Sequence, residues 1–248
     1  MDSTRPALRL FVFHHAGGSH LLYRAWPSRL PGSWDVRLMD APGHGRLLDL
    51  PYITDARRLA DFFVRRIEPE LTCPYAFFGH SMGGLVAYEI TRLLAARGRP
   101  LPVWLGVSGR AAPRPTDLPS PRHALPDSEL QTHLELLGGT PDEVFDNPTL
   151  WARFAPVIRA DLQLAETWRP DPDAGPLPVA LSAYAGREDH FVPPRDMAGW
   201  QEHTDRFLGL TVLDGGHFYF QDDPGPLLAH VERDAAAALA GAGPARSR

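Results

Sequence analysis

A serine at position 81 stands between two glycines in the stretch FFGHSMGGLVAYEI, residues 77–90. The spacing matches G-x-S-x-G, in which a sharp turn between a strand and a helix holds the serine in strained backbone geometry and exposes its hydroxyl. The small residues two positions to either side, Gly79 and Gly83, allow the strand and the helix to pass closely. Ser81 is therefore a candidate nucleophile, provided that the chain also supplies a base and a partner for that base.

A serine hydroxyl is a weak nucleophile at neutral pH, so it needs a histidine base that a carboxylate orients. His217 stands in LDGGHFYF after the last predicted strand, and Asp189 stands in the loop after the preceding strand. Ser81, Asp189 and His217 follow the chain order of α/β hydrolases, in which each residue follows a different strand at one edge of the sheet. His80 adjoins the serine, but neighbouring residues on such a turn point apart. We therefore expect His80 to pack or to stabilise the turn.

Two other carboxylates compete with Asp189 for the histidine. Asp214 ends a predicted strand and is expected to point away from the Nδ1 side of His217. Glu188 alternates to the opposite side of its loop. We therefore predict that Asp189 orients the imidazole.

A serine mechanism also needs two N–H groups that stabilise an oxyanion. One is expected from Met82, the residue after the serine, and the other from the loop FHHAGGS after the first strand, whose glycines let the backbone approach a substrate. The histidines His14, His15 and His44 raise the alternative of a metal cluster. Adjacent histidines do not easily share a tetrahedral ion, and no carboxylate spacing completes a site, so we expect no metal.

Short apolar runs alternate with longer helical patterns, which predicts an α/β fold with a mostly parallel sheet and helices on both faces. The predicted strands are 8–13, 35–40, 75–79, 102–108, 179–185 and 209–214. The predicted helices lie near 21–30, 54–71, 83–97, 195–204 and 224–240. No internal repeat is visible, and we expect the tail GAGPARSR, residues 241–248, to be disordered.

About 70 residues separate the fourth and fifth predicted strands, which is too long for a simple crossover. The segment opens with the proline-rich AAPRPTDLPSPRHALP and continues with helical patterns at 127–139, which Asp127 can cap, and at 147–168. We interpret about 112–172 as a helical lid over one end of the sheet, because ligands of open α/β sheets bind beyond the carboxyl ends of the strands. An ordinary pair of packing helices is the alternative.

The 248 residues are 44% hydrophobic and 22% charged, which suits a single α/β domain over 1–248 with a substantial core. A net charge of −5 and a pI near 6.1 offer no basic surface for nucleic acid or an anionic membrane. The single cysteine, Cys73, excludes an internal disulfide and fits a reducing compartment. No signal peptide and no stretch of roughly 20 apolar residues is readable, so we expect a cytoplasmic protein without a membrane partner.

Together these features resemble one family, the stand-alone type II thioesterases that accompany polyketide and nonribosomal peptide synthases. The similarity covers about residues 8–235 and includes FHHAGGS, APGHGR, FFGHSMGG, VIRADLQLAETW, YAGREDHFVPPRDMAGWQEHT and GGHFYF. It implies an α/β-hydrolase fold. It also implies that Ser81 is the nucleophile, that His217 is the base and that Asp189 orients this base. The two oxyanion N–H donors would be Ala16 and Met82.

The resemblance also implies a substrate and a partner. Acyl groups would be hydrolysed from the phosphopantetheine arm of an acyl or peptidyl carrier protein, or from small acyl thioesters, through an acyl-serine intermediate and without a cofactor of the enzyme's own. Such enzymes typically clear aberrant or stalled acyl units. The sequence departs from the family at two places: arginine is common where His44 stands, and an aromatic residue or proline is common near His14 or His15.

Other functions would use the same residues. An esterase or lipase would share the nucleophile and base, as would an acyltransferase or cyclase that uses a nucleophile other than water. A catalytically silent α/β hydrolase that acts as a binding module is the alternative outside enzymes. The presence of a candidate nucleophile, base and orienting carboxylate argues against that last alternative.

Overall fold

Six strands form one sheet in which every neighbouring pair is parallel, in the order β2-β1-β3-β4-β5-β6. The computed structural model describes residues 5–114 and 121–242. The strands are β1 (Leu8–Phe13), β2 (Trp34–Met39), β3 (Tyr75–His80), β4 (Trp104–Ser108), β5 (Leu177–Gly186) and β6 (Thr204–Leu213). All six predicted strands are present, and the predicted parallel α/β architecture is confirmed.

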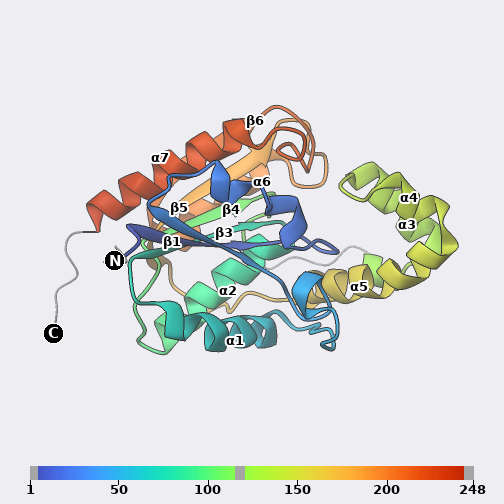
Figure 1. The fold of residues 1–248 in the computed structure, drawn as a ribbon, viewed down its shortest axis with the longest axis horizontal. Helices are drawn as coiled ribbons and strands as arrows, with labels where there is room; N and C mark the ends of the chain where they lie inside the picture. Colours follow the sequence, from blue (N-terminus) through green and yellow to red (C-terminus); the bar gives the residue numbers. More distant parts are fainter. Residues whose placement is uncertain (1–4, 115–120, 243–248) are drawn as a thin grey trace.

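Helices cover both faces of the sheet (Figure 1). The α-helices packed on the sheet are α1 (Ala56–Ile67), α2 (Met82–Ala96), α6 (Pro194–Ala198) and α7 (Gly225–Gly241). One hydrophobic cluster joins the sheet to α1 and α2, and a second cluster joins its other face to α7. Within residues 5–114 and 121–242, no helix combines the length and the apolar character that crossing a bilayer requires.

The residues of β1 alternate between these two clusters. Leu8, Leu10 and Val12 belong to the cluster with α7, whereas Phe11 and Phe13 belong to the cluster with α1 and α2. Side chains of a strand point to opposite faces in turn, and here both faces are buried. A strand buried on both faces reads as an almost unbroken apolar run, which is why LRLFVF was recognisable in the sequence.

Some predicted boundaries were wrong. The helix expected near 21–30 consists of two short 3-10 segments, His20–Tyr23 and Trp26–Ser28, because Pro27 lacks the N–H group that a continuous helix needs. β6 begins at Thr204 rather than near residue 209. β6 is an edge strand, and Asp205 and Arg206 near its start are exposed, so this part of the strand has no apolar pattern. The tail expected to be disordered begins inside α7, which ends at Gly241, and residues 243–248 lie outside the described residues.

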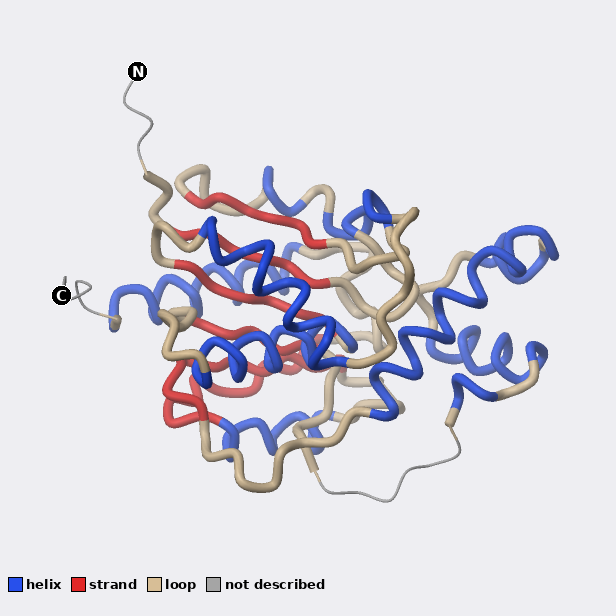
Figure 2. Tube along the Cα trace, turned by 90° about the horizontal axis from the view of Figure 1, so that it is seen from below, coloured by secondary structure: helices blue, strands red, loops and turns tan. Residues whose placement is uncertain are grey.

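The segment between β4 and β5 contains α3 (Asp127–Leu137), α4 (Asp142–Asp146) and α5 (Pro148–Thr167), called the insertion below. These helices lie beyond one end of the strands (Figures 1 and 2). The predicted cap of α3 was wrong, since Asp127 is already the first helical residue and follows Pro126 at the cap position. Its carboxylate instead accepts a hydrogen bond from Nη2 of Arg159 at 2.5 Å. α4 was not predicted, because five residues are too few to show helical periodicity.

The insertion has a hydrophobic core of its own, formed by Leu130, Leu134, Val144, Trp151, Ala155, Ile158 and Leu162. Leu164 belongs instead to the cluster under α1 and α2, and Phe154 is 37% exposed. The apolar side chains of the insertion therefore serve several surfaces. Part of it packs within the insertion, and part anchors α5 on the main core.

Candidate active site

Ser81 occupies a strained turn between β3 and α2. With φ 54° and ψ −116°, it is the one non-glycine residue with positive φ among the described residues. A Cβ atom at Gly79 would lie 2.1 Å from the carbonyl oxygen of Gly83, and one at Gly83 would lie 2.2 Å from that of Phe13. Only glycine fits at either position, as the motif predicted. The Ser81 N–H donates to the Ser108 carbonyl at 2.7 Å, which ties the turn to β4.

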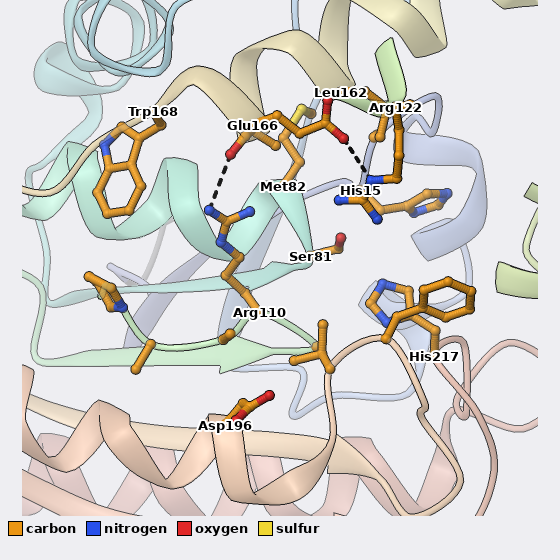
Figure 3. A pocket seen from close by; sticks show the side chains of 18 of the residues that line it. His15, Ser81, Met82, Arg110, Arg122, Leu162, Glu166, Trp168, Asp196 and His217 are labelled. Carbon is orange, nitrogen blue, oxygen red and sulfur yellow. Dashed lines mark hydrogen bonds and ion pairs between the residues drawn. The ribbon is translucent and has the colours of Figure 1, made fainter. Parts of the chain in front are cut away.

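Asp189, in the loop after β5, and His217, in the loop after β6, form a buried pair. Nδ1 of His217 lies 2.7 Å from Oδ2 of Asp189, and both side chains are almost fully excluded from solvent. The other carboxylate oxygen, Oδ1, accepts backbone N–H groups of Phe191 and Val192, each at 2.9 Å. These bonds hold the carboxylate in place. The ring is thereby turned so that Nε2 faces the cavity that Ser81 also lines (Figure 3).

The two competing carboxylates are engaged elsewhere. Asp214 pairs with Nε of Arg187 at 2.8 Å, and its side chain is 87% exposed. Glu188 accepts a hydrogen bond from the backbone N–H of Gly215. Of the three carboxylates considered in the sequence, the structure therefore brings only Asp189 to His217.

His80 is fully buried behind the turn. Its Nδ1 lies 2.8 Å from Oγ of Ser108, and its ring centroid lies 4.8 Å from that of His217. Burial, together with the neighbouring rings of His217 and His15, holds the pKa of His80 well below its usual range. A neutral ring bonded to β4 supports the expectation that His80 stabilises the turn.

The two expected oxyanion donors lie at the same cavity as Ser81. Met82 is the first residue of α2, where N–H groups have no partner within the helix and the helix dipole favours negative charge. Ala16 lies in the loop after β1, and both residues line the cavity. The next residue in that loop, Gly17, has a φ of +73°, so the chain turns sharply there.

Two of the three histidines that raised the metal alternative, His14 and His44, are hydrogen-bonded to protein groups. Nδ1 of His14 lies 2.7 Å from the His15 carbonyl oxygen, and its Nε2 accepts the Ala41 N–H at 3.1 Å. Nε2 of His44 lies 2.8 Å from Oδ2 of Asp161 on α5. Burial lowers the pKa of His14 to about 4 and that of His15 to about 3, so both rings are neutral near pH 7.

The cavity has a volume of about 380 Å³ and is walled on one side by the insertion (Figure 3). Leu137 of α3 and Leu162, Ala165 and Glu166 of α5 lie in its wall together with Ser81. A ligand that fills this cavity beside Ser81 would therefore contact α3 and α5.

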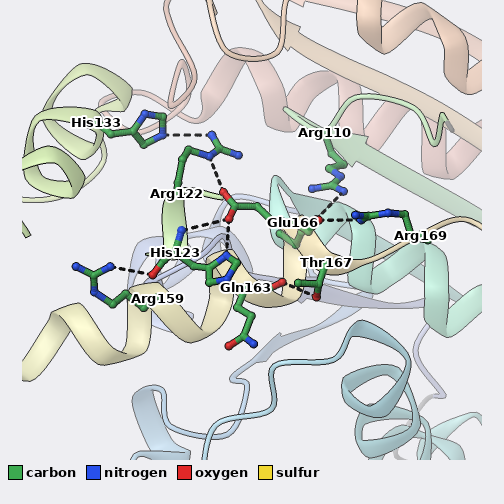
Figure 4. A network of polar contacts seen from close by, with 10 residues as sticks. Arg110, Arg122, His123, His133, Arg159, Gln163, Glu166, Thr167 and Arg169 are labelled. Carbon is green, nitrogen blue, oxygen red and sulfur yellow. Dashed lines mark hydrogen bonds and ion pairs between the residues drawn. The ribbon is translucent and has the colours of Figure 1, made fainter. Parts of the chain in front are cut away.

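Charged side chains line the cavity as well, which the sequence analysis did not anticipate. They are Arg110, Arg114, Arg122, Arg169, Glu166 and Asp196. Glu166 accepts from Nε of Arg122 at 2.6 Å and lies 2.8 Å from Nδ1 of His123, at the centre of a polar network (Figure 4). Burial and the nearby Arg122 lower the pKa of Arg110 to about 10, which leaves it charged at neutral pH.

A parallel sheet, a strained serine turn after β3 and a buried carboxylate–histidine pair after β5 and β6 occur together in α/β hydrolases, and the chain has that fold. The comparisons with known proteins narrow this class. The family model described as thioesterase domain matches residues 8–235. The chain therefore belongs to the thioesterase family, and the extent of the match agrees with the resemblance stated from the sequence.

Three similar proteins illustrate the relationship. LgrE of Brevibacillus parabrevis, which carries the name linear gramicidin dehydrogenase, is 34% identical over 226 residues, covering 90% of this chain and 86% of that protein. The solved structure of the thioesterase RedJ, from the prodiginine biosynthetic pathway of Streptomyces coelicolor, is 34% identical with a TM-score of 0.84 and covers 94% of this chain and 91% of RedJ. BorB, a type II thioesterase of the borrelidin biosynthetic cluster, is 32% identical with a TM-score of 0.81, covering 94% and 93%.

Proposed function

We propose that the protein is a serine thioesterase that hydrolyses acyl groups from the phosphopantetheine arm of a carrier protein in a polyketide or nonribosomal peptide synthase. The observation that carries this proposal is the cavity in which Ser81 and the Asp189-bound His217 lie under the insertion. Membership of the thioesterase family and the pathways named for RedJ and BorB support the substrate class.

The hydrogen bond between His217 and Asp189 defines the first step. With its Nδ1 proton donated to the carboxylate, the ring presents Nε2 as the acceptor for the Ser81 hydroxyl proton. Ser81 then attacks the thioester carbonyl carbon, and the tetrahedral oxyanion accepts hydrogen bonds from the N–H groups of Ala16 and Met82.

Collapse of the tetrahedral intermediate breaks the C–S bond and leaves an acyl group on Ser81. A thiol has a pKa of about 8.5, so its thiolate leaves with little acid assistance. The departing thiolate takes up the proton that His217 received from Ser81, so the ring is neutral again. His217 then accepts a proton from the water that attacks the acyl-serine, and it returns this proton to the Ser81 oxygen as the acid is released. The insertion serves as a lid that contacts the acyl group through α3 and α5.

The name dehydrogenase carried by LgrE has no support in this site. A dinucleotide fold places G-x-G-x-x-G after its first strand, so that the backbone approaches the pyrophosphate. The loop after β1 reads FHHAGGS instead, and its residues His15 and Ala16 line the cavity beside Ser81. The residues at this edge of the sheet suit acyl transfer to a serine.

Replacement of the nucleophile tests the proposal. Ser81→Ala should lower hydrolysis of an acyl carrier protein by roughly four orders of magnitude or more and abolish covalent labelling by a fluorophosphonate. Ser128→Ala, at an exposed position, is the matched control. The same acyl group presented on a carrier protein, on coenzyme A and as a simple oxygen ester measures the substrate class. Wild-type turnover by Ser81→Ala, or a preference for the oxygen ester, would contradict the proposal.

A further inference from the structure

A buried carboxylate of the insertion contacts the loop that carries one expected oxyanion donor. Asp161 of α5 is 3% exposed, and its Oδ2 atom accepts the backbone N–H of Gly17 at 2.7 Å. Gly17 directly follows Ala16, so the peptide bonded to Asp161 adjoins the one proposed to bind the oxyanion. The two residues joined by this hydrogen bond are 144 positions apart in the chain.

The same carboxylate oxygen holds a buried histidine. Nε2 of His44 lies 2.8 Å from Oδ2 of Asp161, and Nδ1 lies 3.0 Å from the carbonyl oxygen of Pro42. Both partners are acceptors, so both ring nitrogens donate and the ring carries a positive charge. Burial opposes that charge, but the hydrogen bond and the negative charge of Asp161 outweigh it and raise the pKa of His44.

Packing reinforces the contact between α5 and the loop. Ile158 lies three residues before Asp161 on the same helix, and its Cγ1 atom lies 2.8 Å from where a Cβ atom at Gly17 would stand. The helix thus rests directly on the glycine backbone. Because Gly17 has no side chain, Ile158 can pack against its backbone while the Gly17 N–H donates to Asp161.

We propose that Asp161 is a positioning residue for the oxyanion hole, with His44 as its buried counter-cation. It holds the Gly17 peptide and thereby orients the N–H of Ala16 towards the oxyanion. This inference rests on the proposed serine mechanism. α5 also contributes Leu162 and Ala165 to the cavity wall. The same helix would therefore contact the acyl group and hold the loop that carries Ala16.

A pair of inhibitors separates this role from a general effect on folding. A trifluoromethyl ketone analogue of an acyl thioester forms a tetrahedral adduct with Ser81 and places an oxyanion in the hole. A matched thioether, which lacks the carbonyl, measures only ground-state binding. Asp161→Asn should weaken the ketone on the order of 100-fold, the scale of losing one oxyanion donor, and leave the Kd of the thioether unchanged. The kcat for acyl thioesters should fall by the same factor, with KM little altered.

The control is Asp127→Asn, which removes another carboxylate of the insertion that pairs with an arginine but lies at the start of α3. It should leave both affinities as in the wild type. Should Asp161→Asn fail to fold, His44→Gln removes the counter-cation, retains one donor and should show a smaller loss of the same kind. Equal weakening of ketone and thioether, or no weakening in a folded variant, would overturn the proposal. A protein that binds the ketone but hydrolyses no thioester would refute the proposed function alone.

Discussion

Oδ2 of Asp189 lies 2.7 Å from Nδ1 of His217, while Asp214, three residues before that histidine, turns away to pair with Arg187. Proximity in sequence therefore does not decide which carboxylate contacts His217. The two backbone N–H groups that hold Oδ1 of Asp189 leave its Oδ2 for the ring.

Replacing that carboxylate tests its role. Asp189→Asn should reduce thioester turnover by roughly 10⁴-fold, because an amide at this position favours the wrong imidazole tautomer. Glu188→Gln and Asp214→Asn should stay within about tenfold of the wild type, because neither side chain contacts His217. Steady-state kinetics on all three variants provides the measurement. If Asp214→Asn were the most damaging, the assignment would be wrong.

The glycines of the serine turn should tolerate no side chain. Gly83→Ala places a Cβ atom 2.2 Å from the Phe13 carbonyl oxygen, and this backbone atom cannot move without displacing β1. We expect destabilisation of about 3 kcal/mol or more, measured by urea unfolding. Gly32→Ala is the control, since nothing lies within 4 Å of its added Cβ. Equal stability of the two variants would show that the turn can relax.

The cavity wall formed by α3 should limit the acyl group. Leu137 lines the cavity, whereas the adjacent Leu136 is 74% exposed. Leu137→Trp should shift preference towards shorter acyl chains, and Leu136→Trp should not. A chain-length series of acyl thioesters compares them, with fluorophosphonate labelling of Ser81 as the measure of an intact nucleophile. An unchanged profile for Leu137→Trp would mean that α3 does not bound the acyl site.

The stability of the fold should depend on the charge of His44. Its pKa in the folded protein is raised above the ordinary value of 6.5, so the folded state binds this proton more tightly than the unfolded chain does. The contribution is fully present below pH 6.5 and is lost as the pH rises through the folded pKa. Among the described residues, Asp161 on α5 and the neutral His14 after β1 contact the ring, and the neutral His15 lies close enough to interact with its charge.

Unfolding free energies measured from pH 6 to pH 9 check this expectation. The difference between the wild type and His44→Gln should be largest at pH 6 and should shrink towards pH 9. Arg58→Gln, at an exposed position of α1, controls for a general effect of removing one positive charge. A difference that grew with pH would mean that His44 is held neutral.

Much of the fold and of the candidate site follows from local patterns in the sequence. Strands buried on both faces show as apolar runs, so β1 was predicted at its observed bounds, and the glycines around Ser81 marked the turn after β3. Because parallel strands end at one edge of the sheet, the position of His217 after the last strand was enough to bring it near Ser81. The exposed start of β6 and the five-residue α4 lacked such patterns, and their bounds were missed.

Only the tertiary structure decided which distant polar groups meet. The hydrogen bonds from Gly17 and His44 to Asp161 join three segments whose separation along the chain leaves no periodic signal. The bond between Glu166 and Arg122 likewise depends on how α5 folds back over the cavity. A buried carboxylate must find its donors in space, and the sequence shows its residue type but not its partners. The candidate nucleophile and base could therefore be predicted from the sequence, whereas the contacts that Asp161 makes with Gly17 and His44 are visible only in the folded structure.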